Sequence, residues 1–164
     1  MLNGTHSNPV DIEIGNSDPF YPDLNVREFQ EQRRVPASLA PALIAAKLNV
    51  AILQINRRLT TWKTRQTDAG RAKLADVPQD RLNVAGSPVD SLLLYYREAV
   101  FHYAMAELHP DVVSIMARDE AMDYREKSGA DAREHYGLAD DFLNRLKGEP
   151  VRKAKPGGFF SALI

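Results

Sequence analysis

The sequence predicts an all-α fold: a bundle of two long helices plus a third and a short N-terminal helix, with extended N- and C-terminal arms. Apolar residues recur three or four positions apart along two long segments, at about 38–66 and 87–109. Capping residues precede these segments, and glycine or proline follows them. No apolar run approaches the roughly 18 to 20 residues of a membrane-spanning helix, so we expect the helices to pack on one another.

The composition is typical of a globular domain with appendages. Of the 164 residues, 44% are hydrophobic and 26% are charged. The net charge of −1 gives the whole chain no electrostatic reason to bind nucleic acid or an acidic membrane. The absence of cysteine excludes disulfides, thiolate metal sites and cysteine nucleophiles. The first residues lack the pattern of a secretory signal, which favours synthesis for use inside the cell.

Residues 1–23 are expected to form an extended N-terminal arm because their prolines and glycines disfavour a helix. This arm carries acidic side chains and no Lys or Arg. Apolar Val10, Ile12 and Ile14 alternate with acidic residues, as in a short strand that adds to a sheet edge or lies along a partner. A disordered terminus is the alternative.

The domain at 24–150 is expected to begin with two helices. Asn25 is placed as an N-cap, with Glu28 completing a capping-box pattern, so a short helix should run to about Arg33. Ser38 is expected to cap a much longer helix that ends near Gln66 and is roughly 40 Å long. The apolar stripe of this longer helix comprises Ile44, Leu48, Ala51, Ile55, Leu59 and Trp62.

The N-terminal half of the longer helix is apolar on more than one side. Leu43, Val50, Ile52 and Leu53 lie off its main stripe. We therefore expect this half to contact two neighbours, and another subunit is one candidate.

Two further helices are predicted in the second half of the domain. Ser87, Pro88 and Asp90 resemble the cap and first turn of a helix that should continue to about His109, before Pro110. A fourth, weaker helix is expected over residues 119–147, interrupted by two glycines and ended by a third.

The loop from Ala69 to Asp80 is patterned rather than merely polar. Leu74, Val77 and Pro78 alternate with charged residues. Such residues either fix the angle between two long helices or contact the next subunit.

The sequence offers little for catalysis. Glu98, His102 and His109 share a helix face, but a metal site between helices needs matching ligands elsewhere, and we find none. No glycine-rich phosphate loop, nucleophile elbow or HExxH motif is present. The carboxylates of the fourth helix are interleaved with arginines, as on a solvated ion-pairing face. We expect no enzyme activity, no metal and no cofactor.

A cluster of basic residues is modest evidence for DNA binding. Its members surround an aromatic residue near the end of the second helix: Arg57, Arg58, Trp62, Lys63 and Arg65. Only part of this cluster can face one way, and the tryptophan lies on the core stripe. A soluble helical DNA-binding or regulatory protein is therefore the alternative function.

The C-terminal tail, residues 151–164, combines a basic stem with an apolar end. Its candidate partner-binding residues are Arg152, Lys153, Lys155, Phe159, Phe160, Leu163 and Ile164. The stem could lie along an acidic surface while the apolar side chains enter pockets. The alternative is that the tail folds back on its own bundle.

Several blocks carry a family resemblance, in order and over most of residues 20–152. They are Phe20-Tyr21-Pro22-Asp23-Leu24, Ile55-Asn56-Arg57-Arg58-Leu59-Thr60-Thr61-Trp62, Ala69-Gly70, Leu74-Ala75-Asp76-Val77-Pro78 with Asp80, Tyr95-Tyr96-Arg97-Glu98-Ala99-Val100 and Gly148-Glu149-Pro150. On these blocks the chain resembles the head completion proteins of temperate, contractile-tailed bacteriophages of the Peduovirus type. The fourth helix and the tail depart from the family pattern.

The resemblance implies a non-enzymatic virion protein of the head-tail neck, present in the host cytoplasm during assembly. Implied partners are the portal protein, neighbouring copies in a ring, a tail terminator or tail completion protein, and DNA passing through the channel without sequence-specific contacts; no membrane is implied. By analogy with adaptor rings, the assembly would be a dodecamer. The candidate subunit-interface residues are Leu43, Val50, Leu53, Leu74, Val77 and Pro78.

Overall fold

The computed structural model describes residues 11–36, 38–116 and 123–151, and it is mostly helical, as the sequence predicts. The four helices described are α1 (Val26–Arg33), α2 (Pro41–Asp68), α3 (Ser91–Met116) and α4 (Asp123–Lys147). Two short antiparallel strand pairs accompany them: β1 (Glu13–Ile14) with β2 (Leu24–Asn25), and β3 (Arg81–Val84) with β4 (Ser87–Asp90). A single 3₁₀ turn, η1 (Leu74–Asp76), lies between α2 and β3.

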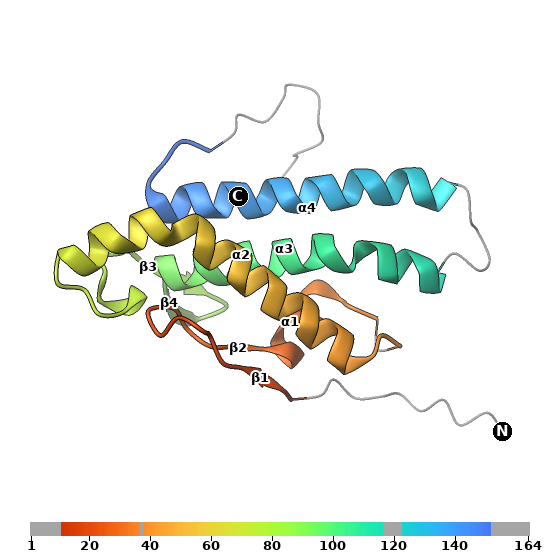
Figure 1. Ribbon diagram of the computed structural model, residues 1–164, viewed down its shortest axis with the longest axis horizontal. Helices are drawn as coiled ribbons and strands as arrows, with labels where there is room; N and C mark the ends of the chain where they lie inside the picture. The colour runs from red at the N-terminus through yellow and green to blue at the C-terminus, as the bar shows by residue number, and fades with distance from the viewer. Residues whose placement is uncertain (1–10, 37, 117–122, 152–164) are drawn as a thin grey trace.

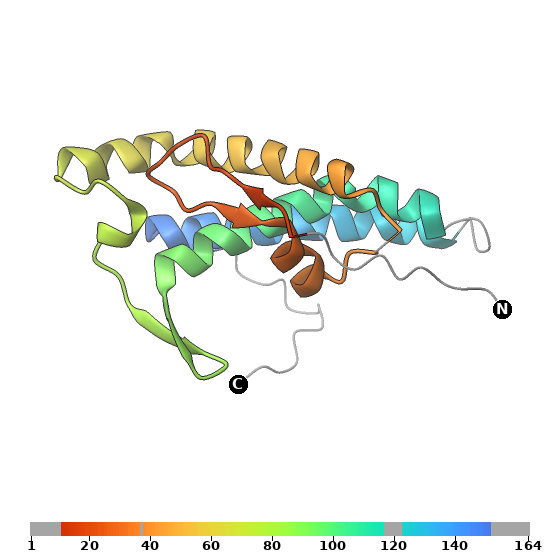
Figure 2. The ribbon, with the colours of Figure 1, turned by 90° about the horizontal axis from the view of Figure 1, so that it is seen from below.

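The three long helices form the body of the molecule. α3 and α4 lie side by side and run in opposite directions, while α2 crosses them obliquely (Figure 1). α1 and the β1–β2 pair cover the side of the bundle away from α4 (Figure 2). The largest fully buried side chains come from α1, α2, η1, α3 and α4: Val26, Phe29, Ile44, Leu48, Ile52, Ile55, Leu59, Leu74, Tyr96, Phe101, Leu108 and Leu143.

Helix α1 begins as its sequence predicts. The Asn25 side chain accepts hydrogen bonds from the backbone N–H groups of Arg27, at 2.8 Å, and Glu28, at 3.4 Å. These bonds satisfy donors that the first turn of a helix leaves unpaired. Val26 and Phe29 are fully buried and dock the helix on the bundle.

Helix α2 carries the predicted apolar stripe, and all of its members are buried. Its start differs from the prediction: Ala40, not Ser38, is the N-cap residue, and it makes no side-chain capping bond. The reason is Pro41, which occupies the first helical position. Proline has its φ angle preset for a helix and has no N–H to satisfy there.

The segment from Asp11 to Asn25 lies on the chain's own helices. Its buried residues include Ile14, Phe20, Tyr21 and Leu24. The ring of Phe20 meets that of Trp62 edge to face, with centroids 6.3 Å apart. This contact holds the segment against α2.

The prediction that residues 87–90 start a helix is wrong, because they form strand β4. Ala85 and Gly86, with φ angles of 50° and 83°, make the two-residue turn that joins β3 to β4. The pair that flanks such a turn exchanges backbone hydrogen bonds, so the next pair, Asn83 and Pro88, does not. Pro88 therefore costs the strand pair no hydrogen bond.

Helix α3 starts at Ser91 and is capped by the loop that precedes strand β3. The backbone oxygen of Asp80 accepts from the N–H of Ser91 at 2.9 Å. The side-chain oxygen of Gln79 accepts from the N–H of Leu92 at 2.8 Å. The loop thus supplies the cap that the sequence analysis assigned to Ser87.

The prediction that α3 ends at His109 is also wrong, since the helix continues through Pro110 to Met116. Pro110 is exposed, whereas Val112 and Val113 after it are buried, so packing of the last turns offsets the hydrogen bond that proline removes.

Helix α4 begins at Asp123 among the described residues and ends at Lys147. Its expected start near Asp119 lies outside the described residues. Gly148, with a φ of 72°, follows the last turn, and the N–H of Glu149 bonds to the oxygen of Asn144 at 2.7 Å. Within the described ranges, none of the helices combines the length and hydropathy that a bilayer-spanning segment needs.

Candidate functional site

The helix-face residues considered for catalysis take part in packing between helices. Glu98 pairs with Arg33 of α1. His102 lies with its Nδ1 atom 2.9 Å from Nδ1 of His135 on α4, and its ring stacks on Phe142. Among the described residues, no group of three or more His, Asp or Glu side chains could hold a metal ion.

The pairing of His102 with His135 was not foreseen, because the two residues lie on different helices. Burial lowers the pKa of His102 to about 3, and the Arg33 guanidinium and His135 act in the same direction. Burial also lowers the pKa of His135, assisted by His109 and Arg33. Both imidazoles are therefore neutral near pH 7 and can share one proton across the helix contact.

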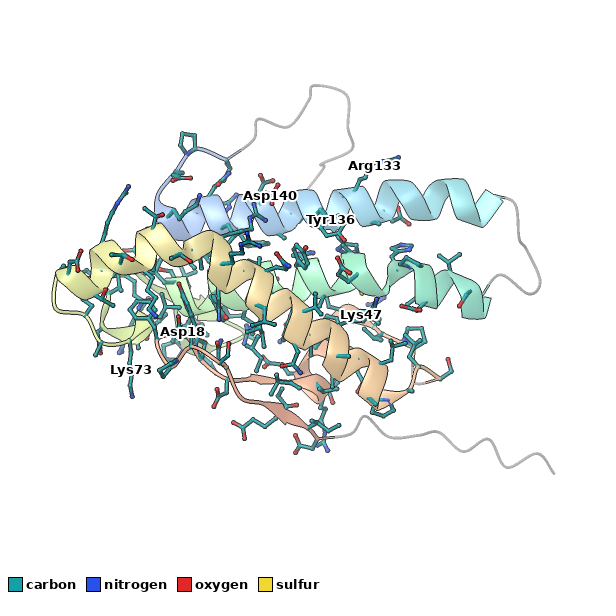
Figure 3. The ribbon with its side chains drawn as sticks, in the orientation of Figure 1. Asp18, Lys47, Lys73, Arg133, Tyr136 and Asp140 are labelled. Carbon is teal, nitrogen blue, oxygen red and sulfur yellow. The ribbon has the colours of Figure 1, made fainter. Side chains whose placement is uncertain are left out.

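Polar contacts continue along the junction of α3 and α4. The hydroxyl of Tyr136 donates to Glu107 at 2.6 Å, and His109 lies 3.7 Å from Asp131. Tyr136 points from α4 toward α3, whereas Arg133 points away from the bundle (Figure 3). This pattern fits an ion-pairing helix face rather than a catalytic group.

Two of the four basic residues in the cluster on α2 form ion pairs within the chain. Arg58 pairs with Asp140 and Lys63 pairs with Asp18, each at 2.6 Å. Both acidic partners are labelled in Figure 3. Trp62 is buried, so its ring is not available to stack on a base. Arg57 and Arg65 are the exposed members without these ion pairs.

The N-terminal half of α2 presents a face without charge to the solvent. We call this the α2 face; its exposed residues are Ala42, Ala46, Asn49, Val50 and Leu53. Val50 is 41% exposed and Leu53 is 56% exposed, and their i, i+3 spacing places them side by side as a small apolar patch. Lys47, the one charged residue in this half, lies 3.6 Å from Asp111. Leu43 is half-buried beside the face and packs on the core.

Two of the loop residues proposed for a subunit interface lie inside the chain's own core. Leu74 is 1% exposed and Val77 is 7% exposed. The N–H of Leu74 bonds to the oxygen of Phe20 at 2.8 Å, which ties the loop to the N-terminal segment. Of the two interpretations of this loop, its geometry favours internal packing. Pro78 is exposed.

The candidate partner-binding residues of the tail lie outside the described residues. They are Arg152, Lys153, Lys155, Phe159, Phe160, Leu163 and Ile164. The last described residue, Val151, is 36% exposed and lies four residues after the end of α4 at Lys147.

Packed helices, polar residues paired between them and an exposed apolar face define a helical domain whose surface is suited to contacts with other proteins. Comparison with known proteins identifies the family to which the chain belongs. Residues 15–154 match the profile of the phage head completion protein (GPL) family, and the chain belongs to this family. Membership of this structural family confirms the expected resemblance and the expectation of a non-enzymatic protein.

Two curated relatives carry the same description. The chain is 29% identical over 90 residues to the head completion/stabilization protein of Escherichia phage P2, a match that covers 55% of this chain and 51% of the relative. It is 27% identical over 119 residues to the probable head completion/stabilization protein of Haemophilus phage HP1, covering 73% and 76%. The chain thus spans about half the length of the P2 relative. No solved structure matches it.

Proposed function

We propose that this chain is a structural protein of the phage head that completes and stabilises the head after DNA packaging. The observation that carries this proposal is the family match over residues 15–154, together with the description shared by the P2 and HP1 relatives. The chain acts by occupying a position in the particle, so its function resides in its contact surfaces.

The finer proposal is that copies of the chain form a ring at the portal vertex, by analogy a dodecamer, and offer a surface to the tail. The α2 face supports it, because Val50 and Leu53 expose apolar area that a neighbouring copy would remove from water. Leu43 would lie at the margin of the same contact, and Pro78, which lies near Trp62 and Gln66 further along α2, is proposed as a separate contact in the ring. DNA would pass through the ring without sequence-specific binding.

The C-terminal tail is proposed as the portal-binding segment. Its three basic residues suit an acidic stretch of portal surface, and its four large apolar residues suit pockets there. Deletion of Gly157–Ile164 should abolish co-purification with the portal and leave the helical circular-dichroism signal unchanged. Replacing Arg152, Lys153 and Lys155 by Gln should weaken binding and reduce its salt dependence. Undiminished portal binding after the deletion would refute this role.

A direct test of the broader function is the protein content of purified particles. Quantitative mass spectrometry should detect the chain in DNA-filled heads at a fixed ratio to the portal protein, and not in empty precursor heads. If filled heads lack the chain, it is not a head completion protein.

The alternative, a DNA-binding or regulatory protein, has weaker support because Arg58 and Lys63 are paired within the chain and Trp62 is buried. Duplex DNA binding that falls steeply with salt, together with no association with heads or portals, would favour this alternative.

A further inference from the structure

The β3–β4 hairpin extends from the bundle on the side opposite the α2 face. In Figure 2, α2 lies along the upper edge of the molecule, whereas the hairpin projects from the lower side. The same view shows α3 and α4 between them. One molecule therefore carries these two surfaces on opposite sides.

The hairpin is well formed but largely uncovered. The strands pair over their full length, yet Arg81, Asn83, Val84, Ser87 and Pro88 are exposed. A two-stranded hairpin is only marginally stable in water unless one face is packed. The hairpin is nevertheless formed while its tip is exposed to solvent. This favours a partner that covers the tip.

The chemistry of the hairpin tip matches that of the α2 face. Leu82 and Val84 share one side of the hairpin with Val89, the partner of Leu82. Val84 is 42% exposed, and the stretch from Leu82 to Val89 carries no charge. Charged residues begin at the base of the hairpin, where Arg81 and Asp90 lie 3.4 Å apart. An uncharged tip is suited to an uncharged protein surface rather than to phosphate.

The exposed large apolar residues of the described chain support a contact between these two surfaces. They are Val50, Leu53, Val84 and Val151, so all but Val151 belong to the α2 face or the hairpin tip. Ala46 and Asn49 beside Val50 have short side chains, which leaves room for a hairpin tip to approach the helix.

We propose that the hairpin tip of one copy packs on the α2 face of the next copy. This inference rests on the proposed ring and names the two surfaces that build it. Because the surfaces differ and lie on opposite sides, the contact is heterologous, and repeated contacts of this kind close into a ring when the rotation permits. A symmetric dimer through the α2 face alone would leave every hairpin tip uncovered.

The absence of cysteine makes disulfide cross-linking a clean test. The variants Val84→Cys and Leu53→Cys would be produced as separate chains and supplied together to assembling heads. The amount of the chain in these heads is measured first. Thr64→Cys, an exposed site further along α2, serves as the control partner for Val84→Cys. Mild oxidation should give disulfide-linked dimers of Val84→Cys with Leu53→Cys at least ten times more abundantly than with Thr64→Cys.

Two results in heads that contain the chain would overturn the inference and leave the proposed function intact. One is equal cross-linking of Val84→Cys to Leu53→Cys and to Thr64→Cys, and the other is a predominance of Leu53→Cys homodimers. Heads that lack even the wild-type chain would overturn the proposed function itself. As a second measurement, Val84→Asp should reduce incorporation into heads at least tenfold relative to Thr64→Asp. Equal incorporation of the two charged variants would contradict the contact.

Discussion

Tyr21 and Tyr96 stack face to face, with ring centroids 4.7 Å apart and planes 5° apart. The Tyr96 hydroxyl donates to Asn56 and accepts from Asn16, both at 2.7 Å, and Asn56 donates to Asn16 at 2.8 Å. Burial raises the pKa of Tyr96, so its hydroxyl stays protonated and able to donate. The N-terminal segment, α2 and α3 thus meet in one closed hydrogen-bonded cluster.

Removing the Tyr96 hydroxyl should destabilise the fold. Tyr96→Phe removes the donor to the Asn56 side-chain oxygen and the acceptor of one Asn16 N–H in a partly buried site, at a cost of roughly 1–3 kcal/mol in the free energy of unfolding. Urea denaturation followed by circular dichroism measures this change. Tyr95→Phe is the matched control, because Tyr95 is half-buried and its hydroxyl makes no hydrogen bond among the described residues. Equal losses in the two variants would show that the cluster contributes nothing specific.

Leu74 should be essential for stability even though it lies in a loop. Leu74→Ala removes a side chain that is 1% exposed and should lower the free energy of unfolding by about 2–5 kcal/mol. Leu74→Asp would bury a charge and should prevent folding. Ala75→Asp changes the exposed neighbour in the same 3₁₀ turn and should be tolerated. A folded Leu74→Asp protein with a wild-type thermal midpoint would contradict the packing role.

The histidine pair predicts that the fold weakens in mild acid. The pKa of both His102 and His135 is lower in the folded chain than the ordinary value of 6.5. The unfolded chain therefore binds more protons as pH falls below 6.5, and stability decreases toward the folded pKa, which is about 3 for His102. Above pH 7 the pair should impose no pH dependence. Chemical denaturation at pH 7.5, 6.5 and 5.5 would measure the loss, at most about 1.4 kcal/mol per pH unit for each histidine.

A variant without both imidazoles isolates this effect from other titrating groups. Arg33, Glu98, His109, Asp131 and Glu134 also lie around the pair. His102→Phe with His135→Leu should give a clearly shallower loss of stability between pH 6.5 and 5.5. A slope as steep as that of the wild type would assign the acid sensitivity to other groups.

A charge on the α2 face should block self-association without unfolding the chain. Val50→Glu adds a carboxylate to an exposed position, so the thermal midpoint should change little, while association between copies should weaken at least tenfold. Sedimentation of the isolated chain, or its incorporation into heads, would measure the loss. Thr64→Glu provides the control on an exposed part of the same helix. Normal assembly of Val50→Glu would exclude this face as an interface.

The helices were predictable where a local signal and the core stripe agreed. Asn25 caps α1 as expected, and the stripe of α2 is buried throughout. The hairpin was missed because Ser87 and Pro88 also fit the start of a helix. The end of α3 was missed because packing of Val112 and Val113 overrides the local effect of Pro110.

The residues of the candidate site were likewise only partly predictable from the sequence. Exposure of Val50 and Leu53 followed from their position off the core stripe of α2, whereas Ile52, also expected off that stripe, is buried because it lies one turn after Leu48. The burial of Leu74 and the pairing of His102 with His135 depend on contacts between segments far apart in the sequence, which periodicity does not encode.

The central claim is that this chain completes and stabilises the DNA-filled head. The most direct measurement is DNA retention, by nuclease protection, in heads assembled with and without the chain. We expect heads without the chain to package DNA and then lose it, and addition of the purified chain to packaged heads to prevent the loss. Equal DNA retention in the presence and absence of the chain would contradict the account.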